Sequence, residues 1–176
     1  MLQERQKNIT NIILFQVGWW STAFLCASGY ELLALGIQMI IVGIHFWKTA
    51  LPKEWKFILS VSLIGFSLDS FLVYFKILKI DTVLEGMIPH PWLLGLWVMF
   101  ATTLKHSLNW ILNLKILAIF SGVLLGPLTY HLAGEKFKIL GFEEPLYINL
   151  LIYAVLWGAL MGVILKLNKV MMKDIK

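Results

Sequence analysis

The stretch "FILSVSLIGFSLDSFLVYF", residues 57–75, decides the class of fold. It is close to the roughly 20 apolar residues that a helix needs to cross the hydrocarbon core of a bilayer. Its one charged side chain is Asp69. A carboxylate in hydrocarbon costs about 2.5–3.5 kcal/mol on insertion scales, so Asp69 is expected to face the interior of a helix bundle or a wet cavity.

The composition of the whole chain agrees with this segment. The 176 residues are 59% hydrophobic and only 14% charged, whereas soluble domains carry about 25% charged residues. Lipid must therefore surround much of the surface. The net charge of +5 is spread in short groups between apolar runs, which argues against a nucleic-acid partner and favours membrane lipid.

Apolar runs recur along the chain at lengths that suit membrane helices. We predict an all-α, polytopic membrane protein that forms a single transmembrane domain over residues 1–176, because the connections are too short for a soluble domain. The six expected transmembrane helices cover residues 9–28, 32–47, 57–75, 91–108, 116–133 and 147–167.

The orientation follows from the lysines and arginines, which gather on the cytoplasmic side of bacterial membrane proteins. If the six spans cross the membrane in alternating directions, eleven of these residues lie on the same side of the membrane as both termini: Arg5, Lys7, Lys48, Lys53, Lys56, Lys105, Lys115, Lys166, Lys169, Lys173 and Lys176. The other side holds four, Lys76, Lys79, Lys136 and Lys138, together with the acidic Asp81, Glu85, Glu143 and Glu144. Both termini are therefore expected in the cytoplasm.

Two glycine pairs indicate close helix packing. Gly122 and Gly126 are four residues apart, and so are Gly158 and Gly162. Small residues at this spacing let two membrane helices approach closely. Pro127 should also bend the fifth span, because proline removes a backbone donor.

Asp69 is the first candidate functional residue. It should lie towards the outer leaflet, on a helical face shared with Ser62, Gly65 and Lys76. It is either a structural hydrogen-bond or ion-pair partner, for example of Lys76, or a site for a ligand, proton or cation. The cost of burying the charge makes both interpretations reasonable.

A second set of polar residues occurs in "MFATTLKHSLNW", residues 99–110. In a continuous helix Thr103, His106 and Asn109 would follow one side, at the cytoplasmic end of the fourth span. Hydrogen bonding between helices is the simpler interpretation. The alternative is a polar pocket for a headgroup or phosphate-like group, or proton transfer at His106, because histidine is the usual side chain for proton transfer at physiological pH. Lys105 is expected to extend to the membrane surface.

The chain lacks the common motifs of soluble active sites. His45, His90 and His131 form no pair at metal-ligand spacing, and the single cysteine, Cys26, adds no partner. Phosphate-binding loops, dinucleotide fingerprints and nucleophile elbows are also absent. The sequence therefore predicts no metal and no cofactor.

Four stretches resemble an uncharacterised family of small bacterial inner-membrane proteins, one of the domain-of-unknown-function families. They are "LFQVGWW" (14–20), "LIGFSLDS" (63–70), "LWVMFATTLKHSLNW" (96–110) and "GPLTYHLAG" (126–134). The third is the most specific, and the chain departs from the family pattern at Lys105, where the family has asparagine. The resemblance implies a multi-pass protein of the bacterial inner membrane and no particular chemistry. Size and topology are also similar to the substrate-binding subunits of energy-coupling-factor vitamin transporters, a likeness of architecture alone.

Three hypotheses for function remain open at this point. The first is binding or movement of a small or amphiphilic molecule, with Asp69, Thr103, His106 and Asn109 as ligand-binding residues. The second is a membrane enzyme or accessory factor in lipid modification, with His106 as acid or base. The third is a structural subunit that binds another membrane protein.

Overall fold

Helices make up most of the computed structural model, which describes residues 3–80 and 90–171. The elements are α1 (Glu4–Ala27), α2 (Glu31–Lys48), α3 (Glu54–Tyr74), β1 (Leu78–Ile80), α4 (Pro91–Thr103), α5 (Asn109–Leu112), α6 (Lys115–Phe137), β2 (Leu140–Phe142) and α7 (Leu146–Met171). The prediction of an all-α fold is confirmed, apart from one short antiparallel ladder in which Leu78 pairs with Phe142.

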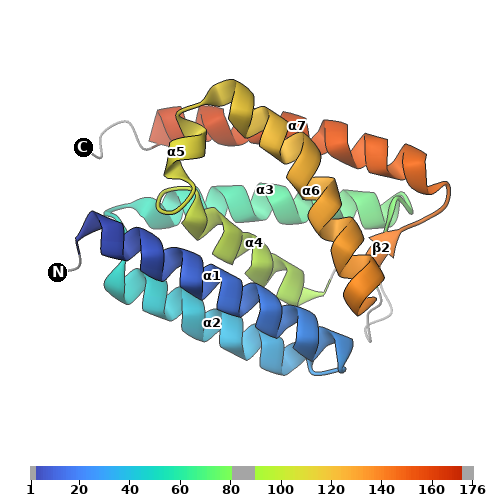
Figure 1. Ribbon diagram of the computed structural model, residues 1–176, viewed down its shortest axis with the longest axis horizontal. Helices are drawn as coiled ribbons and strands as arrows, with labels where there is room; N and C mark the ends of the chain where they lie inside the picture. Colours follow the sequence, from blue (N-terminus) through green and yellow to red (C-terminus); the bar gives the residue numbers. More distant parts are fainter. Residues whose placement is uncertain (1–2, 81–89, 172–176) are drawn as a thin grey trace.

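The helices form a bundle with two distinct ends (Figure 1). α1 and α2 are an antiparallel pair joined by a tight turn, in which Gly29 takes the positive φ of 78° that glycine tolerates best. α6 and α7 are a second pair, and α3 and α4 pack together between them. The start of α1 and the end of α7 lie at one end of the bundle, while β2 lies at the other (Figure 1).

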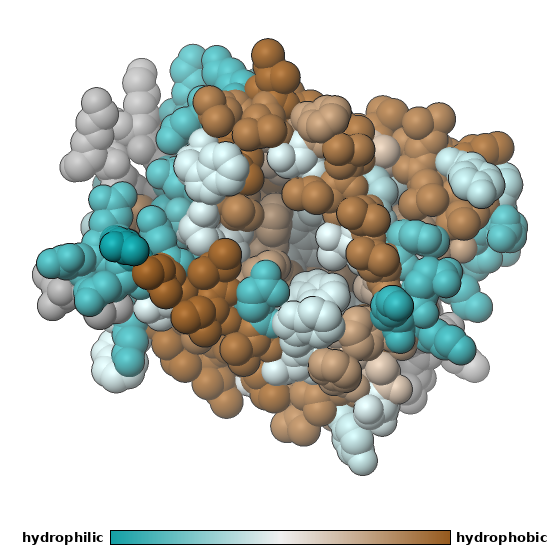
Figure 2. All heavy atoms as spheres, viewed as in Figure 1, coloured by the Kyte–Doolittle hydropathy of each residue, from teal (hydrophilic) through white to brown (hydrophobic). Residues whose placement is uncertain are grey.

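The surface of this bundle is apolar. Large hydrophobic side chains are exposed on all the long helices, and they form wide patches on the face seen in Figure 2. Five helices, α1, α2, α3, α6 and α7, are long and apolar enough to cross a membrane. The protein is thus a multi-pass membrane protein, because water would not tolerate so much exposed apolar surface.

The fourth predicted span differs most from expectation. Instead of continuing to residue 108, α4 ends at Thr103 after 13 residues, a length of about 20 Å at 1.5 Å per residue. It is a shorter apolar helix than the other five, although it also runs between the two ends of the bundle (Figure 1). Residues 104–108 form a turn closed by the N–H of Leu108, which donates to the carbonyl of Thr103 at 2.8 Å.

Close packing of α6 on α7 explains three of the four paired glycines. A methyl group added at Gly122 would collide with Met161, and one at Gly126 would collide with the ring of Trp157. One at Gly158 would lie 2.8 Å from Val123. A methyl group added at Gly162 would lie in open space, so of this pair only Gly158 packs against α6.

Some residues used in the orientation argument cannot be placed. Asp81, Glu85, Lys173 and Lys176 lie outside the described residues. The remaining lysine-rich segments assigned to the cytoplasm, such as the α2–α3 connection, lie at the same end of the bundle as the start of α1 (Figure 1).

Candidate functional site

Asp69 lies at the centre of the first buried polar cluster. Its carboxylate is fully buried in α3. One oxygen, Oδ2, accepts hydrogen bonds from Trp97 Nε1 at 2.6 Å and from the Tyr130 hydroxyl at 2.7 Å. The other, Oδ1, accepts one from the Tyr153 hydroxyl at 3.1 Å. These donors come from α4, α6 and α7, so a single side chain links four helices.

The partner suggested for Asp69 from the sequence, Lys76, does not take part in this cluster. Lys76 is exposed just beyond the end of α3. Three neutral donors hold the carboxylate instead. A carboxylate with three hydrogen bonds has its polar groups satisfied, as a structural role requires.

The second cluster is built around Glu54, the first residue of α3. This side chain is fully buried at the end of the bundle where α1 begins. Its Oε2 accepts a hydrogen bond from the backbone N–H of Leu51 at 2.6 Å, which closes the short turn between α2 and α3. The helix N-terminus also favours a carboxylate at this position.

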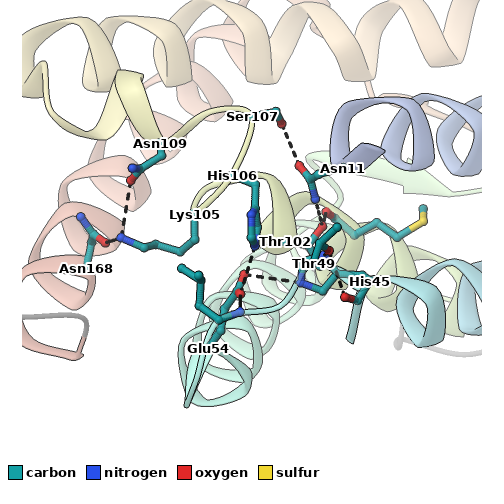
Figure 3. A network of polar contacts seen from close by, with 12 residues as sticks. Asn11, His45, Thr49, Glu54, Thr102, Lys105, His106, Ser107, Asn109 and Asn168 are labelled. Atoms are coloured by element: carbon teal, nitrogen blue, oxygen red, sulfur yellow. Dashed lines mark hydrogen bonds and ion pairs between the residues drawn. The ribbon is translucent and has the colours of Figure 1, made fainter. Parts of the chain in front are cut away.

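Two histidines lie next to each other against the Glu54 carboxylate, with ring centroids 5.1 Å apart (Figure 3). His106, in the turn after α4, places Nε2 at 3.1 Å from Oε2. His45, in the last turn of α2, places Nε2 at 3.5 Å from Oε1. Both imidazoles are buried, with exposed fractions of 1% for His45 and 4% for His106. We call His45, Glu54 and His106 the histidine–glutamate cluster.

Lys105 lies beside this cluster and is half-buried in the turn that follows α4. Its ammonium donates to Asn168 Oδ1 at 3.0 Å and to Asn109 Oδ1 at 3.5 Å (Figure 3). Burial lowers the pKa of Lys105, while the nearby charge of Glu54 acts in the opposite direction. The two direct partners are neutral amides, and within residues 3–80 and 90–171 no carboxylate contacts the ammonium.

The remaining predicted site residues take separate roles. Thr103 is buried, but its hydroxyl donates to the carbonyl of Phe100 at 2.6 Å. Asn109 is partly exposed; its side chain accepts a hydrogen bond from Lys105, and its backbone N–H donates to the carbonyl of His106 at 3.2 Å. The single polar stripe expected from a continuous helix is not formed, because the helix ends at Thr103 and residues 104–108 turn.

Thr102 belongs to a third set of contacts that ties α1 to this region. Asn11 donates to the Thr102 hydroxyl at 3.1 Å and accepts a hydrogen bond from Ser107 at 2.8 Å. Asn11 has an exposed fraction of 1%. These contacts position the turn that carries Lys105 and His106.

Sequence reasoning missed Glu54 and the importance of His45. Neither matches a motif, because the three members of the cluster are separated by 9 and 52 positions in the chain. A signal was nevertheless present. The predicted topology places the end of the second span, the start of the third and the end of the fourth at one membrane face, and all three residues occur there.

One cavity of about 30 Å³ lies between α1, α4 and α6, and Tyr130 lines it together with Trp19 and Leu93. That volume holds about one or two water molecules. A whole amphiphile does not fit inside, so any such ligand would have to lie partly on the surface.

Comparison with known proteins identifies a family but no activity. Neither the curated proteins nor the solved structures contain a match to this chain. A family model described as "Protein of unknown function (DUF2878)" matches residues 8–163, a range that includes every member of both clusters described above. The expected resemblance to an uncharacterised family is confirmed, and the chain belongs to the DUF2878 family.

Proposed function

We propose that the protein binds the anionic headgroup of a membrane amphiphile at the end of the bundle that carries Lys105. One observation supports this proposal above the others. The half-buried Lys105 ammonium is held in place by the amide oxygens of Asn168 and Asn109. A fixed cation at the end of membrane helices attracts phosphate or carboxylate groups of lipids.

The surroundings of Lys105 support an amphiphile rather than a purely soluble ligand. Apolar side chains cover the helices next to this end, including Trp110, Leu114 and Ile116, which are all exposed. A molecule with an acyl chain could therefore place its chain along the helices and its headgroup at Lys105. The small enclosed volume of the bundle also favours binding at the surface.

Removing the Lys105 charge should weaken headgroup binding. Lys105→Gln keeps a long polar side chain, and we expect about fivefold weaker binding of short-chain phosphatidylglycerol, because one lysine near a membrane contributes about 1 kcal/mol. The measurement is a titration of the purified chain in detergent, followed by native mass spectrometry. Inorganic phosphate in a parallel titration separates a headgroup site from a free-anion site.

Two controls make this titration decisive. Lys166→Gln removes an exposed lysine from α7 and should leave the affinity unchanged. Phosphatidylcholine with the same chains should bind the parent protein more weakly than phosphatidylglycerol. Equal affinity for the two lipids, or equal losses in both lysine variants, would refute a headgroup site at Lys105.

A second candidate function is catalysis on a membrane-borne substrate. The Glu54 carboxylate lies 3.1 Å from His106 Nε2 and can hold this imidazole in one orientation. Oriented imidazoles act as general acids or bases near neutral pH. The hypothesis of a structural subunit for a larger membrane complex also stays a prediction.

A further inference from the structure

Three metal-binding side chains converge within the histidine–glutamate cluster. One potential ligand atom from each of His45, Glu54 and His106 can be chosen so that all lie within 4.8 Å of one another. All three side chains are buried. They come from three different segments, the end of α2, the start of α3 and the turn after α4, so the fold alone brings them together (Figure 3).

The hydrogen bonds of Thr49 determine which nitrogen of His45 is available. The Thr49 hydroxyl donates its one proton to the carbonyl of His45 at 2.9 Å. Its oxygen lies 2.8 Å from His45 Nδ1. Because the hydroxyl proton is already used, Nδ1 must carry a hydrogen and donate to Thr49. In a neutral imidazole the lone pair is then on Nε2, directed towards Glu54.

This arrangement leaves two acceptors facing each other. His45 Nε2 and Glu54 Oε1 are 3.5 Å apart, and neither has a hydrogen-bond partner among the described residues. Buried polar atoms without partners are rare in folded proteins, and each one calls for an explanation. A lone pair opposite a carboxylate oxygen is unfavourable unless a positive charge lies between them.

We propose that His45 Nε2, the Glu54 carboxylate and His106 Nε2 bind a divalent first-row transition-metal ion. Two imidazoles and one carboxylate suit Zn²⁺ and similar ions, whereas Mg²⁺ and Ca²⁺ prefer oxygen ligands alone. Ligands at about 2.0–2.2 Å in a tetrahedral site lie about 3.4 Å from each other. His106 Nε2 lies 3.1 Å from Oε2 and His45 Nε2 lies 3.5 Å from Oε1, both near this value, and one ligand atom from each of the three residues lies within 4.8 Å of the others.

The groups around the three ligands also match a metal site. Metal-bound histidines commonly donate their second nitrogen to a fixed acceptor, which orients the ring. Thr49 provides that acceptor for His45. Three protein ligands leave one tetrahedral position for water or a substrate atom, the arrangement found in catalytic rather than structural zinc sites. This inference does not depend on the headgroup proposal.

The test is metal binding by the purified full-length chain without an affinity tag. After treatment with a chelator, the protein in detergent is titrated with Zn²⁺ by calorimetry, and with Co²⁺ while its visible absorption is recorded. We expect one ion per chain and the absorption of a Co²⁺ site with nitrogen and oxygen ligands. No added lipid is needed, so failure here is distinct from failure of the headgroup site.

Substitutions test which side chains bind the ion and which hydrogen bond orients His45. His106→Gln and His45→Gln should weaken Zn²⁺ binding at least about 100-fold, more than the loss of a group that only hydrogen-bonds a metal ligand usually does. Thr49→Val should weaken it about tenfold or more, while Thr49→Ser, which keeps the hydroxyl, should restore it. His131→Gln on α6 is the matched control and should bind like the parent chain.

We check that each variant is folded by gel filtration and by measuring its thermal midpoint with and without Zn²⁺. The ion should raise the midpoint of the parent and of His131→Gln but not that of His106→Gln. Absence of Zn²⁺ binding by the parent chain would overturn the proposal. The positive charge between His45 and Glu54 would then be a proton on His45, which forms an ion pair with the carboxylate. Zn²⁺ binding unchanged in a His45→Gln and His106→Gln double variant would also overturn it.

Discussion

At the residue scale, Asp69 explains how a carboxylate is tolerated deep in an apolar chain. The cost of burial is offset by hydrogen bonds from Trp97, Tyr130 and Tyr153. Each bond to a charged acceptor contributes about 1.5–3 kcal/mol. The sequence correctly indicated that Asp69 needs polar partners, but it suggested a lysine where the structure uses aromatic donors.

Replacing Asp69 should therefore destabilise the fold. Asp69→Leu leaves buried donors without an acceptor, and one such donor costs about 1–3 kcal/mol. We expect a lower thermal midpoint in detergent, corresponding to a loss of at least about 2 kcal/mol. Ser67→Leu, two residues earlier on an exposed face of α3, is the control and should change little. A midpoint for Asp69→Leu equal to that of the control would mean that the hydrogen bonds contribute nothing to stability.

At the scale of elements, α6 and α7 show why equal spacing does not mean equal roles. Gly126 packs directly against the ring of Trp157, whereas an added Cβ at Gly162 would have no neighbour within 4 Å in the part of the chain that the structure describes. Both glycines were assigned to helix packing by the same sequence pattern. Which face of α7 meets α6 depends on the rotation of the helix, and a four-residue spacing does not specify it.

The two glycines should respond oppositely to alanine. Gly126→Ala forces a methyl group into a rigid indole, and overpacking of this kind costs about 1–3 kcal/mol. Gly162→Ala should be neutral or stabilising by up to about 1 kcal/mol, because alanine favours helices over glycine. Thermal unfolding in detergent measures both. Similar midpoints for the two variants would contradict the observed packing.

A second feature at the scale of elements is that α4 is shorter than its hydrophobicity predicts. Hydrophobicity alone extends the fourth span to residue 108, but Thr103 is the last helical residue. Beyond it, the backbone bends so that His106 reaches Glu54 and Ser107 reaches Asn11. These partners lie far away in the sequence, so a local pattern could not reveal the turn.

At the scale of the whole molecule, one end of the bundle carries the start of α1, the end of α7 and most of the lysines among the described residues. The eleven-to-four distribution of basic residues in the sequence predicts that this end faces the cytoplasm. The histidine–glutamate cluster and Lys105 are at that end, and Asp69 belongs to a separate cluster. A ligand of the histidine–glutamate cluster would then reach it from the cytoplasmic side.

Cysteine labelling in intact bacterial cells tests this orientation. In a Cys26→Ser background, Lys53→Cys and Lys169→Cys should resist a membrane-impermeant thiol reagent until the cells are opened. Lys138→Cys and Glu144→Cys, at exposed positions of the opposite end, should react in intact cells. Labelling of the Lys53 position from outside would invert the proposed topology.

The amino-acid sequence by itself determined the class of this protein. Apolar runs of this length are stable only as helices embedded in lipid, because a helix satisfies its own backbone hydrogen bonds. For the same reason the sequence marked Asp69 and His106 as residues that must turn inward, and both are buried.

Only the tertiary structure decided which polar groups meet. His45, Glu54 and His106 occur in three segments without a shared motif, and their contact depends on how α2, α3 and α4 pack. Likewise, Asp69 finds its donors on three other helices. The physical reason is that hydrophobicity acts along a segment, whereas hydrogen bonding and metal coordination require particular atoms within a few ångströms of each other.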